Sequence, residues 1–138
     1  MDKDMSKNYD YLFSPEGYDD LTKEDKKRIC NGCGPRSKFD FVPDTIYGLN
    51  ISEACNRHDY MYEKAYPNIE AKKEADRVFL NNIIRIIDHE TKKRIGWKGL
   101  SFKNPLIWLR KRRAYNYYLA VKSFGGPAFW KNKNKNKL

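Results

Sequence analysis

The sequence predicts an all-α protein, and three observations support this fold class. Apolar residues recur at three- and four-residue spacing in several segments, which places them on one face of a helix. Glycine and proline lie between these segments, where a helix must end. No segment alternates apolar and polar residues as a half-buried strand does, and no internal repeat is present. We therefore expect helices joined by loops.

The first expected helix is short and follows an irregular arm. Residues 1–21 are polar and aromatic, and we interpret them as an arm without regular structure. Thr22, with Asp25 three residues later, resembles a capping box, so a helix is expected over about 22–30. Residues 36–51 show no helical stripe and contain a proline and a glycine, so they are expected to be a loop.

The second expected helix, over 52–66, carries the residues of greatest chemical interest. Ser52 can act as its N-cap, and Pro67 stops it. Its inward face contains a titratable imidazole, His58, with Asp59 beside it, whereas a core face normally avoids such groups. That face comprises Ala54, Cys55, His58, Tyr62 and Ala65. A purely structural pair is the alternative interpretation of His58 and Asp59.

A third helix is expected over 69–89, and its apolar stripe contains an acidic residue. Its apolar stripe comprises Asp76, Phe79, Leu80, Ile83 and Ile87. An ionised carboxylate that faces a core is costly unless it is paired or hydrogen-bonded. Asp76 therefore needs a donor, and His58 on the preceding helix is the obvious candidate. Tyr62, one turn after His58, can hydrogen-bond the same carboxylate.

The C-terminal part is expected to hold a basic linker over 91–104 and a basic helix over 105–123 that starts with a proline. The inward stripe of this helix is expected to comprise Leu106, Leu109, Arg113, Tyr117 and Ala120. With 138 residues, the chain is expected to form a single domain over 1–130, followed by a disordered basic tail over 131–138.

Charge is distributed unevenly along the chain. From Thr91 onward there are 14 Lys and Arg and no Asp or Glu, which leaves 14 basic against 18 acidic residues, a net charge of −4, before that point. Such a cationic region implies an anionic partner. The run Arg110–Arg113 next to Trp108 fits a membrane interface, where tryptophan and cationic side chains anchor at headgroups. It fits the phosphates of a nucleic acid equally well.

A Gly-rich loop, Asn31-Gly32-Cys33-Gly34, adds a candidate metal site. Glycines let several backbone carbonyls point to one place, and calcium takes six to eight oxygen ligands, carboxylates and carbonyls among them. Asp59 can supply the carboxylate. A cation there would polarise a substrate carbonyl or phosphate, while His58 takes a proton from water and Asp76 fixes its tautomer.

The three cysteines permit one internal disulfide and leave one thiol over. Cys30 and Cys33 also have the spacing of a zinc half-site or of a redox pair. Zinc would need two further ligands, for which the chain offers Cys55, His58 and His89. The cysteine pattern by itself leaves these uses open.

The motifs of the two central helices and the loop resemble those of a known superfamily. Residues 55–62, Cys-Asn-Arg-His-Asp-Tyr-Met-Tyr, resemble the Cys-x-x-His-Asp-x-x-Tyr active-site helix of the secreted phospholipase A2 superfamily. Residues 31–35 are similar to the Gly-Cys-Gly calcium loop of its divergent group XII and small bacterial members. Residues 75–77, Ala-Asp-Arg, are similar to the Asp-Arg that opens its second catalytic helix. The resemblance covers about residues 28–90.

The resemblance implies a small helical phospholipase A2-like fold, with two antiparallel catalytic helices, a Gly-rich calcium loop and a third, basic helix. It also implies an activity, the calcium-dependent hydrolysis of the sn-2 ester of glycerophospholipids. In that activity His58 would be the general base, Asp76 its orienting partner and Tyr62 a supporting hydroxyl.

The same resemblance implies a calcium site and a disulfide. Calcium would be bound by Asp59 and the backbone carbonyls of Gly32 and Gly34. The family's bridge from the calcium loop to the active-site helix maps onto Cys33 and Cys55, which leaves the third cysteine as a thiol.

The active-site motif favours lipid over nucleic acid as the partner, so we expect a monomer on phospholipid membrane surfaces, with anionic lipid favoured. The alternative is a catalytically weak or inactive module of the same fold, which binds anionic membrane or nucleic acid through its basic C-terminal third. No apolar run approaches 18 residues, and the N-terminus lacks the apolar stretch of an export signal. The residues alone favour a cytoplasmic protein or non-classical release, whereas the resemblance implies secretion.

Overall fold

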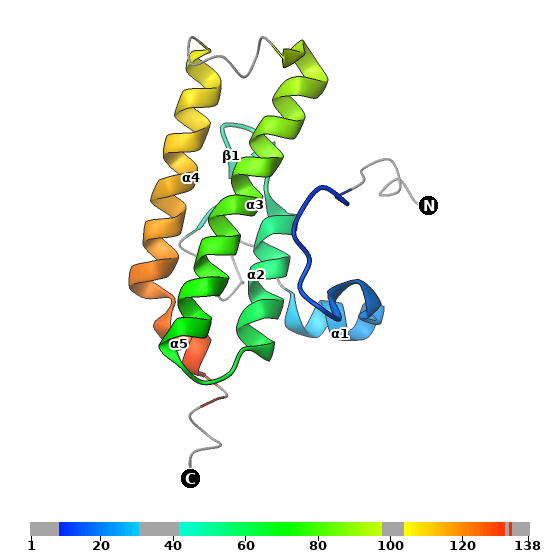
Figure 1. The fold of residues 1–138 in the computed structure, drawn as a ribbon, viewed down its shortest axis with the longest axis vertical. Coiled ribbons are helices and arrows are strands. Elements are labelled where there is room, and N and C mark those ends of the chain that lie inside the picture. The colour runs from blue at the N-terminus through cyan, green and yellow to red at the C-terminus, as the bar shows by residue number, and fades with distance from the viewer. Residues whose placement is uncertain (1–8, 31–41, 98–103, 132, 134–138) are drawn as a thin grey trace.

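The computed structural model describes residues 9–30, 42–97, 104–131 and 133. Within these ranges the protein is mostly helical (Figure 1), in agreement with the predicted all-α class. The helices are the 3-10 helix η2 (Tyr18–Asp20), α1 (Lys23–Ile29), α2 (Ser52–Lys64), α3 (Ile69–Ile95), α4 (Pro105–Phe124) and α5 (Gly126–Trp130). Two short strands, β1 (Thr45–Ile46) and β2 (Leu49–Asn50), form an antiparallel hairpin. No helix within these ranges has the length and apolar character needed to cross a membrane.

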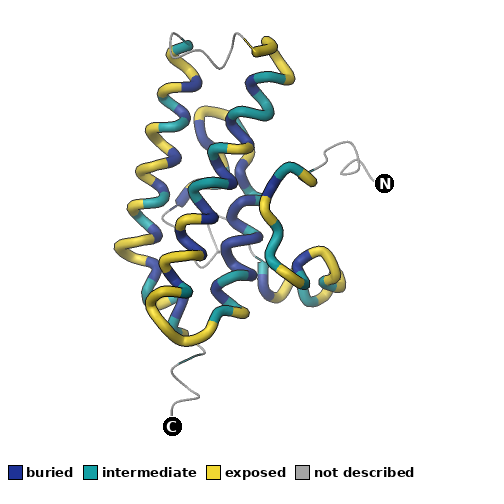
Figure 2. The backbone as a smooth tube through the Cα atoms, viewed as in Figure 1, coloured by how far each residue is buried: buried dark blue, intermediate teal, exposed yellow. Residues whose placement is uncertain are grey.

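Three helices build the centre of the molecule (Figure 1). α2 and α3 are joined by a tight turn and run antiparallel, as expected for the helices that carry His58 and Asp76, and α4 packs antiparallel along the other side of α3. α5 lies at the end where α3 begins, while α1 and the N-terminal arm lie beside α2. Buried residues follow the inner faces of the three central helices (Figure 2), so the core lies between them.

The start of α2 differs from the prediction by one residue. Ile51 occupies the N-cap position and Ser52 is the first helical residue, so Ser52 is not the cap. The backbone amide of Ser52 donates to Oδ1 of Asn50 at 2.8 Å instead. The predicted inward residues are buried, apart from the half-buried Ala65. α2 is covered around most of its circumference, because the buried set also includes Arg57, Asp59 and Tyr60.

α3 is longer than predicted and extends into the expected linker. Asn68 caps its start, accepting from the amide of Ala71 at 2.8 Å. Residues 90–95 contain good helix formers and no glycine or proline. The helix therefore continues to Gly96, which has a φ of 76° that glycine adopts readily.

α4 has nearly the predicted bounds but a different buried face. Asn104 caps it, accepting from the amide of Leu106 at 3.1 Å, and a proline occupies the first turn. Of the residues predicted to face inward, Tyr117 alone is buried, whereas Leu106 and Arg113 are exposed. The buried residues are Ile107, Arg110, Ala114, Tyr117 and Val121. Apolar residues occur all around this helix, so its sequence supports more than one stripe.

The hairpin corrects the prediction of loop over 36–51, and α5 is a helix that the sequence analysis did not predict. In the hairpin, Thr45 pairs with Asn50 and Ile46 with Leu49. The turn residues Tyr47 and Gly48 have φ of 48° and 80°, the left-handed pair that a two-residue hairpin turn requires. Strands of two residues are too short to show an alternating pattern. α5 begins immediately after α4 because its proline stands in the first turn, where no amide donor is needed.

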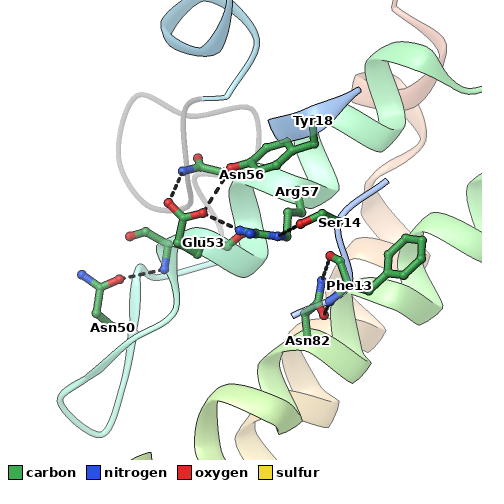
Figure 3. A network of polar contacts seen from close by, with 9 residues as sticks. Phe13, Ser14, Tyr18, Asn50, Glu53, Asn56, Arg57 and Asn82 are labelled. Atoms are coloured by element: carbon green, nitrogen blue, oxygen red, sulfur yellow. Dashed lines mark hydrogen bonds and ion pairs between the residues drawn. The ribbon is translucent and has the colours of Figure 1, made fainter. Parts of the chain in front are cut away.

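Side chains, rather than regular structure, hold the N-terminal arm to the core (Figure 3). The backbone amide of Phe13 donates to Oδ1 of Asn82 at 2.9 Å, and Nδ2 of Asn82 donates to the carbonyl of Phe13 at 3.1 Å. Nε of Arg57 donates to the hydroxyl of Ser14 at 3.0 Å, and the same guanidinium pairs with Glu53. The arm is thereby attached to both α2 and α3.

Two expectations concern residues outside the described ranges. Cys55 is disulfide-bonded and Cys30 is a thiol, as expected, but the expected bridging partner, Cys33, is not among the described residues. The calcium-loop glycines, Gly32 and Gly34, also lie outside them, as does most of the expected basic tail. Because its sulfur forms a disulfide, Cys55 is not available as the zinc ligand considered above.

Candidate active site

His58 and Asp76 are in contact between α2 and α3. Nε2 of His58 lies 2.8 Å from Oδ1 of Asp76. The hydroxyl of Tyr62 donates to the same oxygen at 2.6 Å, and Nζ of Lys72 donates to Oδ2 at 2.8 Å. Three side chains thus converge on one carboxylate, and the sequence placed two of them there. We call His58, Tyr62, Lys72 and Asp76 the buried cluster.

Burial and hydrogen bonding set the charges in the cluster. The side chains of His58 and Asp76 are 1% and 3% exposed. Burial raises the pKa of the Asp76 carboxyl, but the hydrogen bonds from His58, Lys72 and Tyr62 outweigh burial and hold this pKa below its usual value. Burial, reinforced by the charge of Asp76, raises the pKa of the Tyr62 hydroxyl. Asp76 is therefore an ionised acceptor, and Tyr62 a neutral donor.

The neighbours of His58 fix both its tautomer and its orientation. Because an ionised carboxylate can only accept, the imidazole donates through Nε2 and, when neutral, has its lone pair on Nδ1. The ring centroids of Tyr62 and Phe79 lie 4.3 and 4.6 Å from that of His58. Tyr62 packs edge-on against Phe129 of α5, with centroids 5.0 Å apart. Packing thus orients the imidazole and also the hydroxyl that supports Asp76.

Lys72 is the member of the cluster that the sequence reasoning missed. This residue is 5% exposed, and its Nζ also donates to the carbonyls of Val121 and Lys122 at 3.1 and 3.3 Å. Those carbonyls belong to the last turn of α4, at the negative end of the helix dipole, and that of Val121 also accepts from the amide of Gly125 at 2.8 Å. Lys72 therefore connects Asp76 to the end of α4. The four-residue spacing between Lys72 and Asp76 is the signal that could have identified it.

A glycine at the junction of α4 and α5 lets the chain pass close to Tyr62. A Cβ added at Gly125 would lie 2.8 Å from the Tyr62 hydroxyl and 2.5 Å from the carbonyl oxygen of Val121. No atom of the described residues lies within 4 Å of the equivalent position at the adjacent Gly126. Gly125 is therefore needed for this close approach, a second feature that the sequence analysis did not identify.

Asp59, the expected calcium ligand, is fully buried beside His58 on α2. Among the residues that the structure describes, no group of three or more His, Cys, Asp and Glu side chains could hold a metal ion. The expected site requires only one such side chain, because its other ligands would be the carbonyls of Gly32 and Gly34. One carboxylate together with backbone carbonyls is a donor set that suits calcium.

A recess of about 560 Å³ lies on another side of α2. Glu53 and Arg57 line it, together with residues of the N-terminal arm, α1 and the β2 strand, and Figure 3 shows the polar network at its wall. Asp10, Asp19 and Lys26 are also among its lining residues, so both signs of charge are present. His58, Asp59 and Asp76 do not line this recess, and it is therefore not where the chemistry of the buried cluster would occur.

Comparisons with protein-family models, with curated proteins and with solved structures found no match to this chain. The resemblance to the phospholipase A2 superfamily therefore rests on the residues of the motifs, and the activity that it implies is a proposal.

Proposed function

We propose that this protein is a calcium-dependent, phospholipase A2-like hydrolase that cleaves the sn-2 ester of glycerophospholipids. The observation that carries the proposal is the contact of His58 with an ionised carboxylate, Asp76, which Tyr62 and Lys72 also hydrogen-bond. A core histidine with a purely structural role can be satisfied by one neutral acceptor. An imidazole whose tautomer is fixed by a buried carboxylate is typical of a general base.

The proposed reaction follows from the proton on Nε2 of His58. Asp76 keeps that proton in place, so the lone pair of Nδ1 can accept a proton from water as the water oxygen attacks the sn-2 carbonyl carbon. The ester bond then breaks, and Nδ1 returns the proton to the departing alkoxide of the lysophospholipid. Asp76 stabilises the imidazolium during these steps, as a carboxylate does for other histidine bases.

Asp59, with the carbonyls of Gly32 and Gly34, would hold the calcium ion. Calcium bound there would supply positive charge that stabilises the oxyanion developing on the sn-2 carbonyl oxygen, the kind of interaction that usually contributes most to acyl transfer.

Lys72 and Tyr62 would act on Asp76 rather than on the substrate. The charge of Lys72 balances that of Asp76, which lowers the cost of burying the carboxylate beside a neutral imidazole. Tyr62 occupies a second lone pair of Oδ1 and limits rotation of the carboxylate. Both are therefore positioning residues.

Fatty-acid release from phosphatidylglycerol vesicles tests the proposal. We expect release in calcium and none in chelator, and we expect Asp59→Asn to lose most of the calcium-dependent activity. In a separate measurement, calcium should raise the melting temperature, because a ligand that binds only the folded state stabilises it by about 1.4 kcal/mol at ten times its Kd. Asp59→Asn should abolish this rise. Vesicle binding without any release of fatty acid would favour the inactive binding module instead.

A further inference from the structure

The outer face of α4 carries an exposed row of aromatic, aliphatic and cationic side chains. Its members are spaced by four, three, four and three residues, which places them on one side of the helix, opposite the buried side. All five are exposed: Trp108, Arg112, Tyr115, Leu119 and Lys122. We call this row the outer stripe. α4 contains no Asp or Glu, so no acidic side chain of this helix competes for its cations.

A small recess lies beside the outer stripe, between α4 and the hairpin. It has a volume of about 210 Å³, and its lining residues are Tyr47, Leu109, Arg112, Arg113 and Asn116. Two guanidinium groups, an amide and a phenol therefore face one small space, and none of the described residues that line it carries a carboxylate. All the polar groups at its wall can donate hydrogen bonds, and two of them are always charged.

Hydrogen bonds between the hairpin and α4 fix the position of the hairpin beside this recess. Nη2 of the buried Arg110 donates to the backbone carbonyl of Tyr47 at 2.7 Å, and the hydroxyl of Tyr117 donates to the carbonyl of Thr45 at 3.0 Å. Both contacts fix the hairpin to α4. Nη2 of Arg113 donates to the Tyr47 hydroxyl at 3.1 Å, and its guanidinium lies 4.9 Å from the Tyr47 ring centroid. Arg113 is thus oriented before any ligand arrives.

Arg112, the other arginine of the recess, is linked to the outer stripe. Its guanidinium lies 5.5 Å from the ring centroid of Trp108. An acidic residue on the neighbouring α3, Asp88, is engaged elsewhere, since it pairs with Lys111 at 2.9 Å. The recess and the stripe therefore form a continuous cationic surface with an aromatic border.

We propose that the recess binds the phosphate of an anionic phospholipid headgroup while the outer stripe rests on the bilayer interface. This deepens the proposed function, since the same lipids would be the substrate. The planar fork of arginine matches phosphate oxygens in pairs, and the amide of Asn116 adds a donor. Tryptophan and tyrosine occupy the headgroup level of a bilayer, with cationic side chains around them.

Exposed aliphatic and aromatic side chains favour lipid over nucleic acid on this face. Within the outer stripe, Leu119 is 38% exposed, and Trp108 and Tyr115 are 54% and 51% exposed. Phosphates and sugars of a nucleic acid offer such side chains little, whereas the boundary between headgroups and acyl chains gives them an apolar environment.

Vesicle co-sedimentation tests this proposal without requiring turnover. Ether-linked phosphatidylglycerol and phosphatidylcholine vesicles are used in chelator, at about 0.15 M ionic strength. We compare the wild type with Arg112→Gln/Arg113→Gln and with Lys23→Gln/Lys27→Gln, a control on α1 that removes the same charge from exposed positions. Loss of the two arginines should weaken phosphatidylglycerol binding about 30-fold, and the control should change it little.

A charge-preserving variant separates the recess from charge alone. Arg112→Lys/Arg113→Lys keeps both positive charges but loses the planar fork, so it should bind phosphatidylglycerol more weakly than the wild type and more tightly than the double glutamine variant. Equal binding by the wild type and the lysine variant would refute the proposal that the recess binds the headgroup phosphate. Equal losses in the α1 control, equal binding to both vesicle types, or tighter binding to duplex DNA than to vesicles would overturn the docking of this face on lipid.

Discussion

The buried cluster and the outer stripe use the same pairing of a cation with an aromatic ring in opposite ways. In the cluster, Nζ of Lys72 lies 5.9 Å from the ring centroid of Tyr62, and its charge is neutralised by Asp76. In the stripe, Arg112 lies over Trp108, and α4 offers it no carboxylate. The first arrangement satisfies every charge internally, and the second leaves charge available to a partner.

This difference predicts which property a substitution in each region should affect. A buried ion pair contributes little net stability, but removing one partner leaves a desolvated charge and is costly. An exposed cation contributes little to folding, and its effect appears in association. Variants of the buried cluster should therefore alter chemistry and stability, and variants of the outer stripe should alter vesicle binding.

The largest expected effect is that of His58→Gln on turnover. Removing the proposed general base should lower the rate by about 10²–10⁴-fold, because the attacking water of the proposed reaction would lose its proton acceptor. Binding to ether-linked vesicles should not change, since His58 is buried away from the outer stripe. Fatty-acid release and co-sedimentation are the two measurements. A folded His58→Gln protein with wild-type turnover would contradict the mechanism.

Lys72→Met should destabilise the fold by about 3–5 kcal/mol, because Asp76 would remain buried without its counter-charge. The adjacent Lys73 provides a matched control. Its side chain is 64% exposed and lies 3.9 Å from Glu70, so Lys73→Met should cost only about 0–1 kcal/mol. Urea unfolding measures the free energy of unfolding of both variants. Equal losses would contradict the idea that the charge of Lys72 stabilises the buried carboxylate of Asp76.

Gly125→Ala should cost about 1–3 kcal/mol and lower turnover, since the new methyl group would meet both the carbonyl oxygen of Val121 and the Tyr62 hydroxyl, and would displace that hydroxyl from its contact with Asp76. Gly126→Ala, which meets no atom within 4 Å, is the control and should leave turnover unchanged. Thermal melts and fatty-acid release compare the two. Identical behaviour of both alanine variants would show that the close approach to Tyr62 has no consequence.

The smallest expected effect is the acid sensitivity conferred by Asp76. Its pKa is lowered in the folded state, so its contribution to stability is fully present above the unfolded value, about 3.9, and is lost as the pH falls through the lower folded value. Urea midpoints between pH 7 and pH 2 should decline more steeply for the wild type than for Asp76→Asn. Parallel declines would exclude Asp76 as a source of acid sensitivity.

The sequence predicted the central helices and the contact between His58 and Asp76 because these depend on local spacing. The inward faces of α2 and α3 follow a regular period, and a carboxylate on an apolar stripe requires a donor. The end of α3 was predicted too early, because a run of lysine and arginine resembles a linker although these residues favour a helix. The buried side of α4 depends on Arg110, whose burial is compensated by the carbonyl of Tyr47, a contact between residues far apart in the chain.

Lys72 and Gly125 could not be assigned from local patterns for the same reason. A lysine in the first turns of a helix is normally solvated, and Lys72 is buried only because the end of α4 brings two carbonyls to its ammonium group. The requirement for glycine at position 125 arises from two contacts, one to the carbonyl oxygen of Val121 in the preceding turn and one to Tyr62, more than sixty residues earlier in the chain. Both features depend on the packing of α4 and α5 against α2 and α3.

The contact between Asn82 and Phe13 has a consequence for where the folding unit begins. A side-chain amide has the same donor and acceptor as a peptide group, so Asn82 pairs with Phe13 as the backbone of a neighbouring strand would. Asn82 is 0% exposed, and without the arm its amide group would lose its acceptor, the carbonyl of Phe13, whereas Oδ1 would keep the hydrogen bond that it accepts from Nη1 of Arg85 at 3.1 Å. The part of the chain that packs as one unit therefore includes the stretch around Phe13, ahead of η2, which has no regular secondary structure of its own.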